Sequence, residues 1–389
     1  MGLEHIWLIW LLSSLTFIRF YIMMGRHLPK LIGKSKQSKF NTPEIIFQIT
    51  TKGHMPIVQT TINQINATCR SINYSKYEIW VVSEKPDVFE GARLINVPGD
   101  FSCNAIFKGR ALQYAVYLRN IEKRNQENTW IYHLDDESLI TKQTLCNILT
   151  YLEGEPSQIS EGLIIYPVGK EEKIKLTNLL DTLRPFCCFE CMDFMEHGNP
   201  AYLHGSNLLT RSDIEEKIGW DTGKTIAEDT LFAITATRKL DSRAFGWHGG
   251  VIEEKSPYTL RDFMKQRVRW FCGLIQNMNY LNRKEKFAQS IRAFLWSIGF
   301  LSGVASILAL FWQQNIDLSL RIFFIISSAL WLLSYQTGAF LNGKYLSFKK
   351  RLQFHFLTLL FSPLLGIIES SIPIIALLKP TGTFEVIRK

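Results

Sequence analysis

Two groups of acidic residues in this chain have types and spacings that suit chemistry. The run Asp135–Glu137 directly follows an apolar segment, and adjacent carboxylates repel one another unless a cation or solvent intervenes. Alternation along an extended segment puts Asp135 and Glu137 on one side, where their oxygens suit Mg²⁺ or Mn²⁺. The alternative is a solvated acidic turn, but the position after an apolar strand favours the metal. We therefore predict that Asp135 and Glu137 hold a divalent cation.

The second acidic group is the pair Glu228-Asp229 in the segment IAEDTLFAITA. Asp229 stands at the start of an expected helix that runs to about Arg238, and acids in that position often only cap the helix or interact with its dipole. The other interpretation is a general base that accepts a proton from a reacting hydroxyl. Both interpretations stay open on these residues alone.

A third polar group occupies the run KQRVRW, on an amphipathic helix expected over 259–281. Gln266 lies one helical turn from Arg269 and Trp270, so all three share a face, where the arginine can compensate negative charge. The alternative is an interfacial helix whose tryptophan anchors in lipid headgroups and whose arginine meets lipid phosphate.

These groups lie within an alternation of strands and helices. Short β-branched or aromatic apolar runs predict buried strands at 44–50, 77–83, 130–135 and 162–168. Helices are expected between them at 56–68, 105–119 and 141–152. The alternation predicts a doubly wound α/β sheet whose ligands lie beyond the carboxyl ends of its strands, where Asp135 falls.

Three apolar segments, 6–24, 293–312 and 322–341, are long enough to cross a bilayer, which takes about 20 helical residues. A signal peptide is the rival interpretation of the first, but no small-residue cleavage site follows it and basic residues lie on the wrong side. A fourth segment, 352–378, contains Pro363, Glu369 and Pro373. It is therefore either a kinked span or a re-entrant hairpin, and we expect it to turn back within the membrane or to lie along it.

The net charge of +9 is concentrated next to these segments, with basic clusters at 26–39 and 344–351. The positive-inside rule places such clusters, and with them the polar stretch from about 40 to 287, in the cytosol beside membrane lipids. We expect a multi-pass integral membrane protein, of the endomembrane system in a eukaryote or the plasma membrane in a prokaryote. No motif supports nucleic acid as a partner.

The seven cysteines form no paired framework, as expected of a reducing compartment. Cys187, Cys188 and Cys191 cluster, and a zinc site would need a further ligand such as His197 or His204. Without a second Cys-x-x-Cys, buried reduced thiols are the favoured interpretation.

The ordered set of acidic run, acidic pair and Gln-x-x-Arg-Trp, followed at once by apolar helices, resembles the membrane-bound inverting glycosyltransferases of family 2. The blocks FKGRALQYAVY, WIYHLDDES, HGSNLLTRSD and IEEKSPYTLRDFMKQRVRW are similar to those of the egghead-type β-1,4-mannosyltransferases, over about residues 44–273. The resemblance implies a nucleotide-diphospho-sugar transferase domain of GT-A, Rossmann-like type with transmembrane α-helices. It also implies transfer of mannose from GDP-mannose to a glycolipid.

The resemblance further assigns roles to single residues. The family's acidic pair ends in the aspartate that deprotonates the acceptor, which corresponds to Asp229, with Glu228 orienting the base or the acceptor. Lys108 corresponds to a lysine near the diphosphate, and Glu84 to an acid on the nucleoside. The residues before Glu84 are Val-Val-Ser where Val-Thr-Asp is expected, so a UDP-sugar donor stays open beside GDP-mannose.

Gly205 and Ser206 resemble the turn that lines the family's acceptor channel, and Trp270 is expected to present its ring to a sugar. The tail TFEVIRK resembles a gating segment, although Ile387 replaces the expected threonine. Donor contacts are predicted for Gln266, Arg269, Trp270 and Lys389.

We predict five segments: a membrane helix with a basic flank (1–39), the cytosolic transferase domain (40–258), an interface helix (259–287), membrane helices with the fourth apolar segment (288–378) and a cytosolic tail (379–389). The predicted activity is the inverting transfer of a hexose, mannose or glucose, to a lipid-linked acceptor. The enzymatic alternative is a processive polysaccharide synthase of the cellulose, mannan or hyaluronan synthase type. A catalytically dead scaffold or a transporter is disfavoured, because the apolar segments are almost uncharged except for Arg19 and Glu369, whereas the acidic groups lie outside them.

Overall fold

The computed structural model describes residues 21–22, 24–26, 43–53, 55–312, 318–382 and 387 of the 389-residue chain. It divides into two compact units. Unit 1 comprises Met1–Arg26, Ile165–Glu190 and Lys255–Lys389, and unit 2 comprises His27–Ile164 and Cys191–Glu254. The segment Ile165–Glu190, which we expected within the transferase domain, thus groups with the C-terminal helices.

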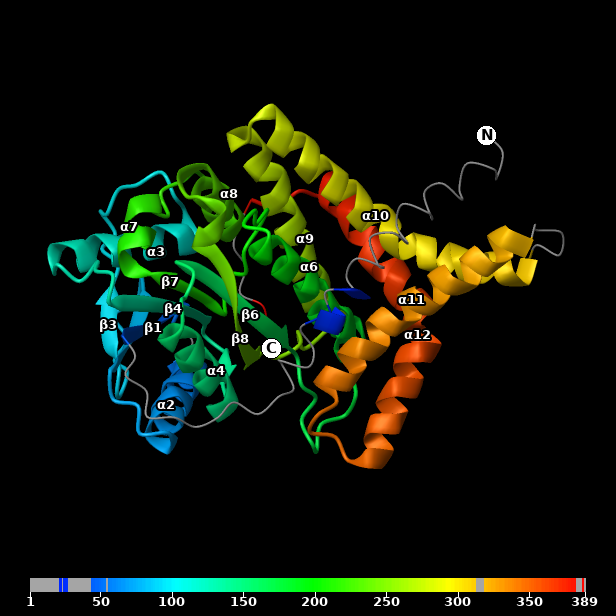
Figure 1. Ribbon diagram of the computed structural model, residues 1–389, viewed down its shortest axis with the longest axis horizontal. Helices are drawn as coiled ribbons and strands as arrows, with labels where there is room; N and C mark the ends of the chain where they lie inside the picture. The colour runs from blue at the N-terminus through cyan, green and yellow to red at the C-terminus, as the bar shows by residue number, and fades with distance from the viewer. Residues whose placement is uncertain are drawn as a thin grey trace. The chain divides into compact units, whose positions relative to one another are not determined.

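Unit 2 is built on an eight-stranded mixed sheet in the order β3-β2-β1-β4-β7-β6-β8-β5 (Figure 1). The strands are β1 (Glu44–Thr51), β2 (Tyr77–Ser83), β3 (Arg93–Asn96), β4 (Thr129–Asp135), β5 (Leu139–Ile140), β6 (Ile159–Ile165), β7 (Leu208–Arg211) and β8 (Phe245–Glu253). β1 is parallel to β2 and β4, whereas β7 is antiparallel to β4 and β6. The predicted α/β sheet is confirmed, and the reversed strand β7 makes it mixed. The carboxyl ends of β1, β2 and β4 meet at one edge.

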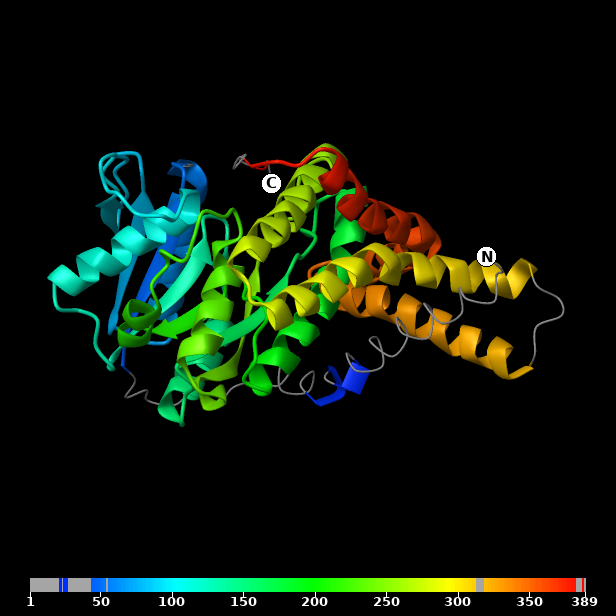
Figure 2. The ribbon, with the colours of Figure 1, turned by 90° about the horizontal axis from the view of Figure 1, so that it is seen from above.

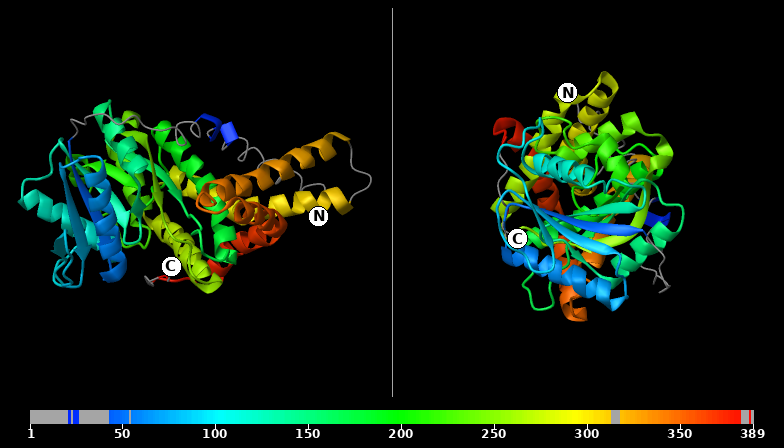
Figure 3. Two further views of the ribbon diagram at one scale, coloured as in Figure 1. Left: turned by 90° about the horizontal axis from the view of Figure 1, so that it is seen from below. Right: turned by 90° about the vertical axis from the view of Figure 1, so that its left-hand side faces the viewer.

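Helices cover both faces of this sheet (Figure 3). On one face, α2 (Met55–Ser71) packs on β5, and α4 (Lys142–Glu153) packs on β8. On the other face, α3 (Phe107–Ile121) packs on β1 and β2, and α7 (Ser212–Ile218) packs on β4 and β7. β4 is buried along nearly its whole length, because its side chains are covered from both sides.

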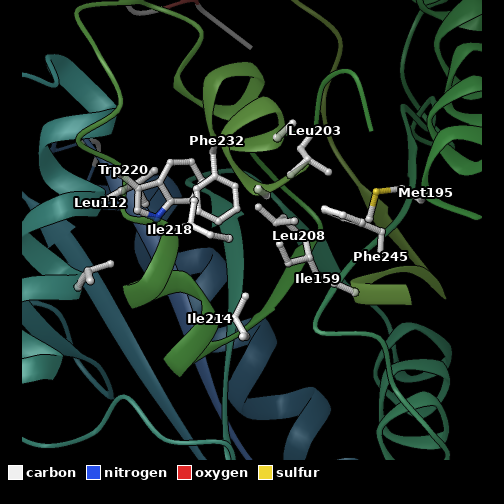
Figure 4. Close-up of a cluster of buried hydrophobic side chains, with 14 residues drawn as sticks. Leu112, Ile159, Met195, Leu203, Leu208, Ile214, Ile218, Trp220, Phe232 and Phe245 are labelled. Carbon is white, nitrogen blue, oxygen red and sulfur yellow. The ribbon is translucent and has the colours of Figure 1, made fainter. Parts of the chain in front are cut away.

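A cluster of buried apolar side chains fixes α8 (Glu228–Lys239) in unit 2 (Figure 4). Within it, the ring of Trp220 stacks on that of Phe232 with the centroids 4.1 Å apart and the planes at 15°. Burying a large apolar side chain contributes about 1.5–3 kcal/mol. Phe232 therefore anchors the helix whose first turn carries Glu228 and Asp229.

A buried ion pair joins α3 to α7. Arg119 Nη2 lies 2.6 Å from Glu215 Oε2, and both side chains are 0% exposed. Glu215 also accepts a hydrogen bond of 2.5 Å from the Trp220 indole N–H, and its Oε1 lies 3.3 Å from His133 Nε2. Burial alone would raise the pKa of Glu215, but Arg119 and His133 hold it at about 2.

Unit 1 is helical. Its helices are α5 (Leu176–Leu180), the 3₁₀ turn Asp181–Leu183, the start of α6 (Arg184–Glu196), α9 (Leu260–Asn277), the 3₁₀ turn Met278–Tyr280, α10 (Arg283–Trp312), α11 (Leu318–Asn342) and α12 (Phe348–Leu378). α10 and α11 contain the apolar segments 293–312 and 322–341 and lie side by side (Figure 2). Both segments are thus helical as predicted. Of the predicted helix at 6–24, residues 21, 22 and 24 are helical, and the rest lies outside the described residues.

Among the described residues, α12 alone is long and apolar enough to cross a membrane by length and composition. It is one continuous helix of 31 residues with Pro363 and Pro373 inside it. The prediction that this segment turns back within the membrane is therefore wrong. A reversal would leave backbone groups without partners, whereas a helix satisfies them internally.

Candidate functional site

Unit 2 brings four of the predicted site residues together beside the carboxyl end of β4. The ammonium group of Lys108, in the first turn of α3, donates hydrogen bonds to Asp135 Oδ1 at 2.5 Å and to the Gly205 carbonyl at 2.9 Å. A Cβ added at Gly205 would lie 3.0 Å from Lys108 Nζ and 3.3 Å from Asp229 Oδ2. Gly205 therefore packs directly against both charged groups, and any side chain there would displace one of them.

Negative charge exceeds positive charge around Lys108. Burial would lower the pKa of Lys108, but Asp135, Glu228 and Asp229 together raise it above its ordinary value. The lysine is therefore charged at neutral pH and faces three carboxyl groups. Such a cluster can take up a further cation or a proton.

Asp229 has the environment of a proton acceptor. Its Oδ1 accepts a hydrogen bond of 2.7 Å from the Thr230 backbone N–H at the start of α8. Burial raises the pKa of Asp229, and Asp135 adds to the rise, although Lys108 opposes it. A carboxylate with a raised pKa is a stronger base than an ordinary aspartate. Its neighbour Glu228 is 8% exposed.

Hydrogen bonds shape the turn that follows β4. The Asp135 backbone N–H donates to Ser138 Oγ at 3.2 Å and Ser206 Oγ at 3.4 Å, and the two hydroxyl oxygens lie 2.8 Å apart. Ser138 also donates to Glu254 at 3.1 Å. Ser206 is only 2% exposed. Ser206 was predicted to contact the acceptor. In the structure its hydroxyl instead supports the backbone of Asp135.

The carboxylates of this turn fit a hard divalent cation. Asp136 is engaged elsewhere, because its Oδ2 accepts a hydrogen bond of 3.1 Å from Thr51 Oγ1. The predicted ligands Asp135 and Glu137 are both partly exposed, and the Asp135 side chain retains 37% exposure beside Lys108. Accessible carboxylate oxygens are the ligands that Mg²⁺ and Mn²⁺ prefer.

Glu84 follows β2 and is 53% exposed. Its Oε1 lies 2.6 Å from Arg110 Nη1, and Arg110 also donates to the carbonyls of Phe101, at 3.1 Å, and Pro98. The sequence analysis missed Arg110. It lies two residues after Lys108 in the block FKGRALQ, which is the signal that points to it.

The Gln-x-x-Arg-Trp motif lies on α9 in unit 1, and its helix begins as predicted, with Thr259 as the N-cap. Gln266 is buried and accepts a hydrogen bond of 2.8 Å from Arg267, the residue after it. The guanidinium groups of Arg267 and Arg184 lie over the Trp270 ring, 4.1 and 4.5 Å from its centroid. The ring expected to meet a sugar is thus already in contact with two cations.

Arg267 also forms a buried ion pair with Asp181, and its Nε lies 4.0 Å from Glu369 of α12. Sequence reasoning missed this network, because its members come from three distant segments of unit 1. Arg269, the third motif residue, is partly exposed. Lys389 of the predicted gating tail lies outside the described residues.

Comparison with known proteins places the chain among sugar transferases. Residues 130–342 match the family model described as glycosyl transferase family group 2. The chain is 31% identical over 255 residues to the β-1,4-mannosyltransferase bre-3 of Caenorhabditis elegans, a match that covers 62% of this chain and 54% of that protein. It is 30% identical over 275 residues to the β-1,4-mannosyltransferase egh of Drosophila melanogaster, covering 67% and 59%. The chain thus matches little more than half the length of these relatives.

Among solved structures, the chain is similar to the mannosyltransferase PcManGT from Pyrobaculum calidifontis in complex with GDP-Man and Mn²⁺. The match has a TM-score of 0.45 at 13% identity and covers 94% of this chain and 98% of that one. Nothing about activity follows from a likeness at this level.

Proposed function

Because the chain belongs to glycosyl transferase family group 2, we propose that it is an inverting β-1,4-mannosyltransferase that moves mannose from GDP-mannose to a membrane glycolipid. The observation that carries this proposal is the contact of Lys108 with Asp135 and Gly205, with Asp229 packed against the same glycine. The names of the nematode and fly relatives support the sugar and the linkage. The apolar helix α12 supports an acceptor that arrives from a bilayer.

The donor side of the reaction requires charge compensation, because a nucleoside diphosphate leaves. Lys108 supplies a permanent positive charge beside Asp135. A divalent cation held by Asp135 and Glu137 would neutralise diphosphate charge when bound. Glu84, held by Arg110 at the end of β2, would contact the nucleoside. Arg269, Gln266, Trp270 and Lys389 are proposed as further donor contacts.

The acceptor side requires a base. Asp229 takes the proton of the acceptor hydroxyl as that oxygen forms a bond to the anomeric carbon. The bond from this carbon to the diphosphate breaks on the opposite side, and the electron pair leaves with the diphosphate. One displacement inverts the anomeric configuration. Gly205 keeps the Asp229 carboxylate in place for the acceptor, since even a methyl group there would press against it.

The proposal is tested on the full chain purified in detergent. It is offered GDP-mannose, UDP-glucose or UDP-N-acetylglucosamine with Mn²⁺, with and without glucosylceramide, and release of the nucleoside diphosphate is followed. We expect release that depends on GDP-mannose and glycolipid together, and a β-linked product by NMR. Turnover restricted to a UDP-sugar, or an α-linked product, would contradict the proposal. A ladder of product lengths would instead favour a processive synthase.

We also propose that unit 2 faces the cytosol, as the basic clusters next to the apolar segments predict. Asn66 and Asn73 both begin formal glycosylation sequons. Expressed in a eukaryotic cell, the chain should carry no glycan at either position. A mobility shift that an endoglycosidase removes, and that disappears in Asn66→Gln/Asn73→Gln, would reverse the proposed topology.

A further inference from the structure

Three potential metal ligands, none of them from the turn after β4, meet inside unit 2. Glu161 comes from β6, Cys191 from α6, and His204 from the segment before β7. Cys191 Sγ lies 3.2 Å from His204 Nε2, and Glu161 Oε1 lies 3.8 Å from His204 Nδ1. One ligand atom of each residue lies within 4.8 Å of those of the other two. The three are buried, with exposures of 0%, 2% and 9%.

The spacing of these atoms is close to that of a zinc site. Zinc binds sulfur at about 2.3 Å and nitrogen or oxygen at about 2.0–2.2 Å, so tetrahedral ligands lie roughly 3.5 Å apart. The 3.2 Å distance goes to His204 Nε2 and the 3.8 Å distance to Nδ1, and an ion binds only one of these nitrogens. With one ligand atom taken from each residue, the three atoms lie within 4.8 Å of one another, so side-chain shifts of about 1 Å would bring them to tetrahedral spacing. The geometry therefore needs little rearrangement to accept an ion.

Glu161 points to a ligand independently of this spacing. Its Oε1 accepts a hydrogen bond from the His204 backbone N–H, which orients the carboxylate. Its other oxygen, Oε2, is buried and has no hydrogen-bond partner in the described part of the chain. Leaving a buried carboxylate oxygen unsatisfied is costly, and a coordinated cation removes that cost.

We propose that Glu161, Cys191 and His204 form a zinc site, with water as the fourth ligand. A thiolate and an imidazole select zinc over Mg²⁺ and Mn²⁺, whereas the carboxylates of Asp135 and Glu137 have the opposite preference. Unit 2 would thus hold two kinds of metal at two separate places.

The zinc site would stabilise the reaction site without taking part in the reaction. His204 directly precedes Gly205, whose carbonyl accepts a hydrogen bond from Lys108. A metal bond to His204 would therefore fix the turn that packs against Lys108 and Asp229. The metal content is measured without substrate, so this inference is tested independently of mannosyl transfer.

The first test is the metal content of the full chain, purified in detergent from zinc-supplemented cells and desalted without chelator. Mass spectrometry should find about one zinc ion per chain in the wild type and a loss of about tenfold in Cys191→Ser and Glu161→Gln. Cys69→Ser is the matched control, because Cys69 is also a free, fully buried thiol but belongs to α2. It should retain the ion. Wild-type protein without zinc, or Cys191→Ser with undiminished zinc, would overturn the proposal.

The second test already gives a decisive result on the wild-type protein. Wild-type protein whose zinc is exchanged for Co²⁺ should show a thiolate-to-cobalt absorption band in the near ultraviolet and the visible bands of tetrahedral cobalt. The thiolate band should be absent from Cys191→Ser, and Cys69→Ser should retain it. A cobalt-loaded wild type with only octahedral, oxygen-ligated spectra would contradict the site, whatever the folding of the variants.

Discussion

The Arg119–Glu215 ion pair and the cluster around Lys108 lie in the same unit but balance their charges differently. Arg119 and Glu215 are both 0% exposed, and the pKa of Glu215 is held at about 2. Around Lys108 a single ammonium faces several carboxyl groups, and Asp135 keeps 37% exposure. The pKa of Asp229 is raised there by burial.

This difference separates a structural ion pair from a reactive site. In a buried pair of one cation and one anion the charges already cancel, so the pair does not bind a further ion. Removing one partner leaves the other as a buried, uncompensated charge. An accessible cluster with excess carboxylates gains from a cation and can accept a proton more readily than an ordinary carboxylate. Charge balance and access, more than the presence of acidic residues, distinguish the two regions.

The largest expected effect concerns the metal at the accessible cluster. Excess chelator should abolish transfer, with recovery on adding Mn²⁺ or Mg²⁺. Asp135→Ala should lower kcat/KM by on the order of 10⁴-fold, because the cation would contact the donor in both binding and reaction. Asp136→Asn is the matched control, since Asp136 faces Thr51, and it should lose less than about tenfold. Full activity in chelator would remove the metal from the mechanism.

The closed pair should instead control stability. Arg119→Met leaves Glu215 buried without its partner and should lower the free energy of unfolding by about 3–5 kcal/mol. Arg124→Met is the control. Arg124 pairs with Glu44 and Glu78, but its side chain is 22% exposed, so the loss should stay near 1 kcal/mol. Urea titration followed by tryptophan fluorescence measures both, and equal losses would refute the distinction.

The same pair predicts how stability depends on pH. The folded-state pKa of Glu215, about 2, lies below the ordinary 4.5. Its contribution is therefore present above pH 4.5 and is lost as the pH falls toward 2, by on the order of 3 kcal/mol. Urea titrations of wild type and Glu215→Gln should converge over this window. A difference in stability that is unchanged from pH 5 to 2 would contradict the assigned pKa.

A smaller effect is expected on the pH dependence of transfer. Burial raises the pKa of Asp229, so transfer should rise with pH as Asp229 loses its proton. Lys108 opposes this rise, and Lys108→Met should therefore shift the acidic limb of the pH–rate profile to higher pH and lower the rate on that limb. Lys85→Met is the control: it alters an exposed lysine elsewhere in unit 2, and its acidic limb should not move. A downward shift in Lys108→Met would place the limb on another group.

The parts of the site that the sequence predicted are those with a local signal. Asp135 ends a near-continuous apolar run, and a run of that kind marks a buried strand without knowledge of its neighbours. Asp229 begins a helix, as its flanking residues indicate. The contact of Lys108 with Asp135 joins two blocks of the sequence that only the family resemblance had connected.

The parts that the sequence did not predict depend on distant contacts. We expected a strand at 162–168, but β6 spans Ile159–Ile165, because Ile159 pairs with Thr210 of β7. β6 begins three residues earlier than expected and therefore includes Glu161. Only cysteines and histidines were considered as zinc ligands, so this glutamate was missed. Trp270 is likewise covered by Arg184, from a segment far away in the sequence.

The most direct test of the central claim compares donor binding with transfer in Asp229→Asn. Calorimetry should show GDP-mannose affinity within about threefold of wild type, while transfer to glycolipid falls on the order of a thousandfold, because only the base is lost. Asp241→Asn, at a side chain 67% exposed, serves as the matched control and should keep both. If Asp229→Asn turned over at near wild-type rate, Asp229 would not be the base and the accessible cluster would not be the reaction site.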